Sequence, residues 1–232
     1  MAAQLAFQVR PDGSHFEQST YYHVYALDFL LFHYLLAGRP KQFEPVLARM
    51  AEYLDWLLGP SRRMAFSGDD DGGRLFHPFG ERNQFGRASL TTSGILLGNS
   101  RWIGSKETTA EQAAWWLGAQ CLATAGGPQP PPAGARAFND SGMVFLQSSN
   151  LFVQFDAGSF GWAGGGHSHA DTMNALVWFE GEPVFIDPGT YTYVADPAAR
   201  DWFRGTAAHN TISIDRQNQG QPAGPFRLRA LY

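Results

Sequence analysis

The sequence predicts an α+β protein, with helices in the first half and an antiparallel, strand-rich second half. Before residue 125, apolar residues recur every three or four positions, which is the period of a helix. A proline- and glycine-rich segment follows at 126–134, and such segments are extended and not helical. Beyond it, short apolar or alternating runs are separated by glycine-containing turns, which is typical of antiparallel strands.

The first half predicts two long helices and two shorter ones. Gly38 and Pro40 end the first long helix, and Gly59-Pro60 ends the second, because glycine and proline interrupt helical hydrogen bonding. Helices in consecutive pairs also fit a toroid of helical hairpins. The expected helices are 21–36, 43–58, 88–97 and 110–122.

The second half predicts strands wherever the apolar period changes from three or four to two. Most of these runs are short and bounded by turn residues, so they favour hairpins over parallel strands. The expected strands are 142–155, 175–179, 183–186 and 210–214.

Charge and composition exclude several classes of partner. The 232 residues carry a formal net charge of −4 and no basic stripe, so we expect no nucleic-acid partner. No apolar run approaches the roughly 20 residues of a membrane span, so we expect no membrane partner. An acidic partner would need a local basic patch, and the chain offers one near its C-terminal end: Arg200, Arg204, Arg216, Arg227 and Arg229.

A histidine cluster preceded by glycines contains several potential catalytic and metal-binding side chains within one short segment of the chain. In an extended chain His167, His169 and Asp171 would point to one face, because residues two apart share a face. Asp187 and His209 follow at the ends of β-like runs. Two imidazoles and one carboxylate from separate segments suit zinc, whereas hydrogen-bonded polar turns are the alternative reading of the same residues. The single cysteine, Cys121, excludes a cysteine-cage site.

Residues 67–74 contain three consecutive aspartates flanked by glycines. A calcium loop counted from Asp69 would close on Gly80, and one counted from Asp70 would place Gly72 and Arg74 at ligand positions, so neither register works. We therefore expect an exposed acidic turn between helices.

Several motifs together resemble the heparinase II/III-like polysaccharide lyases. Over about residues 140–220, these motifs resemble the core of that family's β-sandwich domain, and the N-terminal one resembles the start of a toroid helix. The motifs are Gly166–Asp171, Asp187–Tyr193, Arg204–Thr211 and Asp12–His23.

The resemblance implies roles for individual residues. His169, Asp187 and His209 match the ligands of a structural zinc ion. Tyr22, or its neighbour Tyr21, matches the catalytic tyrosine, and His167 matches a histidine that faces the substrate. Four residues are expected to contact substrate: Glu17, Tyr21, Tyr193 and Arg204. Glu17 matches a carboxylate before the tyrosine, and Tyr193 lies near Asp187. The partner of Arg204 is either a substrate carboxylate or sulfate, or a residue in a surface salt bridge.

The resemblance also implies an activity, namely β-elimination of a uronic-acid polysaccharide with Tyr/His acid–base chemistry. Two alternatives are a non-catalytic carbohydrate-binding module with structural zinc and a zinc-dependent hydrolase. The family carries an asparagine, often with a histidine, on an earlier toroid helix, and no such helix precedes Asp12 here. We therefore expect a fragment of a periplasmic or secreted parent, truncated at both ends and not fully active alone. Its expected parts are a toroid portion at 1–125, a linker at 126–134 and an incomplete sandwich at 135–232.

Overall fold

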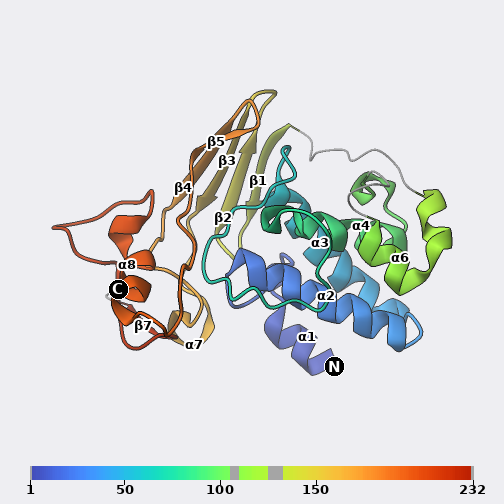
Figure 1. The fold of residues 1–232 in the computed structure, drawn as a ribbon, viewed down its shortest axis with the longest axis horizontal. Coiled ribbons are helices and arrows are strands. Elements are labelled where there is room, and N and C mark those ends of the chain that lie inside the picture. The colour runs from blue at the N-terminus through green and yellow to red at the C-terminus, as the bar shows by residue number, and fades with distance from the viewer. Residues whose placement is uncertain (1, 105–109, 125–132, 231–232) are drawn as a thin grey trace. The chain divides into compact units, whose positions relative to one another are not determined.

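The computed structural model describes residues 2–104, 110–124 and 133–230 (Figure 1). Its contacts divide the chain into two compact units. The first unit comprises Met1–His23, Ala65–Gly72 and Pro132–Tyr232, and the second comprises Val24–Met64 and Gly73–Pro131. The expected linker at 126–134 lies almost wholly outside the described residues, and the expected domain bounds remain predictions.

The first unit is built on a five-stranded antiparallel sheet whose strands follow one another in sequence order, β1-β2-β3-β4-β5 (Figure 1). Short turns join most neighbouring strands of this meander, whereas residues 157–174 form a longer connection between β3 and β4. The strands are β1 Gly134–Phe138, β2 Met143–Gln147, β3 Leu151–Asp156, β4 Ala175–Phe179 and β5 Glu182–Phe185.

One face of this sheet carries a row of buried aromatic side chains. Phe145 contacts Phe138 on one side, with ring centroids 5.8 Å apart, and Phe152 on the other, at 6.0 Å. Phe152 in turn contacts Trp178 at 5.3 Å. Because alternate residues of a strand face the same way, this one row fixes the register of β1 to β4.

The N-terminal segment is tied to the turn between β1 and β2. It begins with α1, Ala2–Gln8, and leads into α2, Thr20–Leu36. The carboxylate of Asp12 accepts the backbone N–H groups of Asp140 and Ser141 at 2.9 and 2.8 Å. These contacts hold the start of α2, where Tyr22 lies, within the first unit.

The C-terminal part of this unit contains short elements joined by loops. In α8, Pro197–Phe203, the Asp196 side chain caps the N-terminus by accepting the backbone N–H of Ala199, and Pro197 begins the helix. The other elements here are the 3₁₀ turn η5 Thr206–Ala208 and a two-stranded sheet of β6 Gly220–Pro222 and β7 Leu228–Ala230; α7 Trp162–Gly165 lies earlier in the chain, between β3 and β4.

The second unit is helical and contains the remainder of α2. Gly86 lets two of its helices pack closely, because a Cβ there would lie 3.2 Å from Leu54 and 3.3 Å from Leu58. Asp28 and Arg74 form a buried ion pair at 2.5 Å in this unit. Its other elements are α3 Glu44–Leu58, α4 Gly86–Leu97, α6 Glu111–Leu117 and the 3₁₀ turns η1 Lys41–Phe43, η2 Arg82–Gln84, η3 Ser100–Trp102 and η4 Ala119–Thr124.

The α+β class is confirmed, and four expected helices and most expected strands are present. The expected strand at 210–214 is wrong: this segment is a loop with one isolated bridge between Ile214 and Gln217. The expected run at 142–155 is two strands, β2 and β3, joined by a turn. Among the helices of the described residues, none has the length and apolar character needed to cross a membrane.

Candidate functional site

Tyr22 and His167 lie against each other in the first unit. Tyr22 is in the first turn of α2, where its backbone N–H donates to the Ser19 hydroxyl at 3.2 Å. His167 lies in the loop that follows α7. The two ring centroids are 4.5 Å apart, and the Tyr22 hydroxyl is 2.9 Å from that of Tyr193. Two groups suited to proton transfer therefore share one location.

The geometry favours Tyr22 over Tyr21 as the reactive tyrosine. Tyr21 is 2% exposed, and its ring packs edge-on against Phe66 with centroids 6.0 Å apart. Tyr22 instead meets His167. Burial raises the pKa of Tyr22 above that of an ordinary phenol, more than the hydrogen bond with Tyr193 lowers it. The phenol therefore holds its proton at neutral pH.

Glu17 lies beside the outer nitrogen of His167. Its carboxylate is 3.9 Å from His167 Nε2. Burial raises the pKa of Glu17, an effect that the nearby charge of His167 opposes. Burial lowers the pKa of His167, but the hydrogen bond to Asp69 and the charge of Glu17 outweigh it and leave that pKa raised. The side chain of His167 is 26% exposed, so it can reach a substrate.

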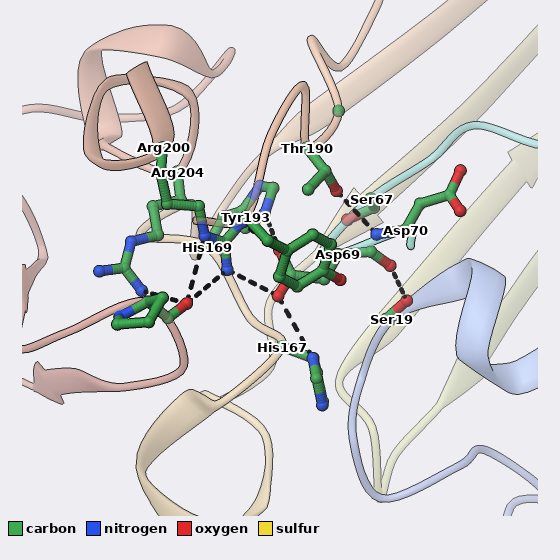
Figure 2. Close-up of polar contacts among 12 residues, drawn as sticks. Ser19, Ser67, Asp69, Asp70, His167, His169, Thr190, Tyr193, Arg200 and Arg204 are labelled. Carbon is green, nitrogen blue, oxygen red and sulfur yellow. Dashed lines mark hydrogen bonds and ion pairs between the residues drawn. The ribbon is translucent and has the colours of Figure 1, made fainter. Parts of the chain in front are cut away.

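Asp69 corrects the expectation of an exposed acidic turn at 67–74. Its side chain is fully buried, and Figure 2 shows it between His167 and His169. Oδ2 is 3.2 Å from His167 Nδ1, and Oδ1 is 3.0 Å from His169 Nε2. Burial acts to raise the pKa of Asp69, but the hydrogen bonds from both histidines and Arg200 outweigh it and hold that pKa below its ordinary value. This carboxylate is therefore charged at neutral pH.

The three expected metal ligands come together. His169, Asp187 and His209 each offer one ligand atom, and these atoms all lie within 4.8 Å of one another. The Nδ1 atom of His209 is 3.1 Å from Asp187 Oδ2. Burial acts to raise the pKa of Asp187, but the hydrogen bond and charge of His209 and the charge of His169 outweigh it and lower that pKa. His169, expected to extend on one face with His167 and Asp171, lies in a loop instead of a strand.

The donor atoms of this set fit a divalent ion of the zinc type. An ionised carboxylate only accepts hydrogen bonds, so His169 directs Nε2–H to Asp69. Its other ring nitrogen, Nδ1, is buried and has no hydrogen-bond partner among the described residues, so its lone pair is left for a metal ion. His209 Nδ1 and Asp187 Oδ2 are close enough together to bind the same ion, and two imidazoles with one carboxylate match zinc chemistry. Orienting the other ring nitrogen by a carboxylate is typical of metal-binding histidines.

Two further carboxyl groups lie near this set: Asp171, which is buried, and Asp156, which is half-buried. Burial raises the pKa of Asp171, against the lowering effect of the charge of His209. Burial and the charge of Asp171 raise the pKa of Asp156 to about 7. A cation held by His169, Asp187 and His209 would offset this concentration of buried negative charge.

Two arginines of the expected basic patch, Arg200 and Arg204, are buried and do not form part of a surface patch. Arg204 is fully buried and donates to Asp201 at 2.7 Å and to the Gly224 carbonyl at 2.6 Å. Arg200 is 1% exposed and binds Asp69. The Arg204 guanidinium thus binds the chain around Gly224. Substrate binding by Arg204 remains a prediction. Tyr193 lies at the site, with its ring 4.8 Å from the Arg200 guanidinium.

Comparison with known proteins finds similar sequences and structures. Residues 130–232 match the family described as heparinase II/III-like, C-terminal. A heparin-sulfate lyase of Bacteroides stercoris is 31% identical over 65 residues, which is 27% of this chain and 10% of that protein. Heparan sulfate lyase HepC from Pedobacter heparinus superposes with a TM-score of 0.70 at 21% identity, covering 94% of this chain and 32% of that one. A structure of heparinase III gives 0.63 at 19%, covering 93% and 34%.

Residues 130–232 are thus similar to the heparinase II/III-like C-terminal domain, and the chain has the α+β fold of the solved structures it matches. The resemblance to this polysaccharide lyase family is confirmed, and residues 130–232 carry the match to its C-terminal domain. The chain spans about a third of the length of the solved structures it matches.

Proposed function

We propose that this chain contributes the catalytic tyrosine, the catalytic histidine and a structural zinc site to a polysaccharide lyase. Its substrate would be an acidic polysaccharide containing uronic acid, cleaved by β-elimination. The contact between Tyr22 and His167, with ring centroids 4.5 Å apart, is the observation that carries the proposal. The similarity to heparin and heparan sulfate lyases supports the substrate class.

β-Elimination requires two proton transfers. A base removes the proton on the carbon next to the uronic carboxylate, the released electron pair forms a carbon–carbon double bond, and the bond to the glycosidic oxygen breaks. An acid protonates the departing oxygen. Each positioned proton transfer is worth about 10²–10⁴-fold in rate. A donor that neutralises the uronic carboxylate adds to this by stabilising the enolate-like charge.

Tyr22 suits the role of acid. Its phenol is protonated at neutral pH because burial raises its pKa, and its hydroxyl is oriented by Tyr193 at 2.9 Å. His167 suits the uronic-acid side, because Asp69 fixes its Nδ1 and leaves Nε2 facing the partly exposed Glu17. Whether His167 takes the proton or neutralises the carboxylate depends on the stereochemistry of the sugar.

A zinc ion would be held by His169, Asp187 and His209. Bound there, zinc would supply fixed positions for three segments of the chain, and we assign it no part in proton transfer. Asp69 separates this set from His167, since it contacts one histidine on each of its oxygens. This arrangement supports a structural ion over one that activates water for hydrolysis.

The test is to incubate the longest gene product that contains this sequence with a panel of uronic polysaccharides. Elimination leaves a conjugated unsaturated sugar, whose ultraviolet absorbance gives the rate. Tyr22→Phe should lower kcat at least about 100-fold with folding unchanged, because the phenolic proton is lost. Tyr21→Phe is the matched control and should stay within about threefold of wild type.

Three results would count against the proposal. Cleavage that is lost on chelation and yields no ultraviolet-absorbing product would indicate a zinc hydrolase. Binding of a polysaccharide without turnover would indicate a carbohydrate-binding module. Equal rates for Tyr22→Phe and wild type would remove the assigned acid.

A further inference from the structure

Asp69 joins the two halves of the candidate site through one carboxylate. Oδ2 accepts from His167, the proposed catalytic histidine, at 3.2 Å, and Oδ1 accepts from His169, a proposed zinc ligand, at 3.0 Å (Figure 2). The carboxylate is fully buried, so it touches neither solvent nor substrate. Its side-chain partners are therefore other buried or half-buried side chains, the rings of His167 and His169 among them.

Arg200 compensates the charge of Asp69 and fixes its plane. Its Nη1 is 2.5 Å from Oδ1 and its Nη2 is 2.7 Å from Oδ2, so the pairing is bidentate. Arg200 is itself held by the Pro225 carbonyl, 2.9 Å from Nη2, and by the Tyr193 ring. The guanidinium cannot rotate without breaking these contacts.

The backbone of Asp69 is anchored on both sides as well. Its N–H donates to the His167 carbonyl at 2.9 Å, and its carbonyl accepts the Ser19 hydroxyl at 2.5 Å. Ser19 also receives the backbone N–H of Tyr22. The position of Asp69 is therefore set by the segments that carry Tyr22 and His167.

A fixed, acceptor-only carboxylate determines how both imidazoles point. It draws Nδ1–H of His167 inward, which directs Nε2 outward to the Glu17 side. It draws Nε2–H of His169, which leaves Nδ1 for the metal set.

We propose that Asp69, held by Arg200, is a positioning residue that couples the zinc site to the catalytic histidine, one ring on each oxygen. The proposal rests on the proposed function for its catalytic part.

The test is the double variant Asp69→Asn with Arg200→Gln, which removes both charges together and leaves no unpaired buried ion. The matched control is Asp28→Asn with Arg74→Gln, another buried pair at 2.5 Å, in the helical unit. Zinc affinity is measured by competition with a chromogenic chelator. Ring tautomers are read from ¹H–¹⁵N spectra of ¹⁵N-histidine protein, assigned with His167→Gln and His169→Gln, and turnover gives kcat and KM.

The test variant should bind zinc about 10–100-fold more weakly and lose kcat by a similar factor, since a carboxylate that orients ligand rings is usually worth that much. KM should change less than about threefold, because Asp69 does not touch substrate. The fixed tautomers of His167 and His169 should be lost. The control should keep zinc affinity, tautomers and kcat.

Wild-type zinc affinity and tautomers in the folded test variant would overturn the proposal. If wild type eliminates no polymer while zinc affinity and tautomers change as expected, the lyase function fails and the positioning role stands. Should the double variant not fold, Arg200→Lys keeps the buried charge but not the two parallel hydrogen bonds. It should weaken zinc binding at least about threefold, and unchanged affinity in it would also refute the proposal.

Discussion

Replacing Gly68 with alanine probes a close backbone approach in the candidate site. Gly68 has a φ of +74°, and a Cβ there would lie 2.9 Å from the His167 carbonyl oxygen, 3.1 Å from Ser19 Cα and 3.2 Å from the Gln18 oxygen. All three are backbone atoms, which cannot move aside as the end of a flexible side chain can. The methyl group must therefore displace the segment that carries Asp69.

Two costs add for Gly68→Ala. Left-handed backbone costs an L-residue about 1–2 kcal/mol, and overpacking costs a further 1–3 kcal/mol or so. The expected loss in free energy of unfolding is therefore about 2–5 kcal/mol. Gly181 has a φ of +83° with nothing within 4 Å of the same Cβ, so Gly181→Ala should lose only the backbone part, about 1–2 kcal/mol.

Equilibrium urea unfolding, followed by circular dichroism, measures both variants, and both positions lie in the first unit. The difference between them, about 1–3 kcal/mol, isolates the cost of the close approach. Gly68→Ala should also weaken zinc binding, because Asp69 is the next residue. Equal losses for the two variants, to within roughly 0.5 kcal/mol, would refute the reasoning.

Two further predictions concern the metal set and its acidic surroundings. His169→Ala should lower the zinc content and the melting temperature, and chelation should lower the melting temperature of wild type but not of this variant; an equal response of both to chelation would place the ion elsewhere. In metal-free protein, Asp156 has a folded-state pKa of about 7, above its ordinary value, so the folded state keeps a proton that the unfolded state releases. The free energy of unfolding should then fall as pH rises from about 4 to about 7, and Asp156→Asn should flatten this slope in urea titrations; parallel slopes would exclude Asp156 as the cause.

Local patterns in the sequence predicted the parts of the site that lie on local motifs. The glycine-preceded His-x-His segment, Asp187 and His209 each stand out by residue type, and His169, Asp187 and His209 come together as expected. Tyr22 lies at a helix start that the apolar period also predicts. Such features are visible because a few neighbouring residues determine them.

Asp69 was missed because its partners are distant in sequence. Arg200 is 131 positions away and His169 is 100. Within Ser67–Gly73, nothing distinguishes Asp69 from Asp70 or Asp71, and a run of aspartates and glycines is typical of an exposed turn. The one available hint is that histidines and arginines in a buried site require an acceptor.

The strand expected at 210–214 failed for a related reason. Its alternating isoleucines satisfy the strand pattern, yet Ile212 and Ile214 are 56% and 74% exposed. The side chain of Asn210 donates to the Ile186 carbonyl at 2.7 Å, so this residue joins a loop contact instead of a ladder. A strand must pair with a neighbouring strand, and the alternation of residues along one segment does not predict whether such a partner lies beside it.

Residues 65–72 belong to the β-rich unit, although the residues before and after them belong to the helical unit. This has a practical consequence for anyone dividing the gene. A cut at the proline-rich segment, which a sequence map would suggest, yields a piece with all three proposed zinc ligands but without Asp69. Arg200 is 1% exposed, and its guanidinium would then lack the negative charge that neutralises it. A shortened protein that folds as the first unit must therefore retain residues 1–23 and 65–72 as well.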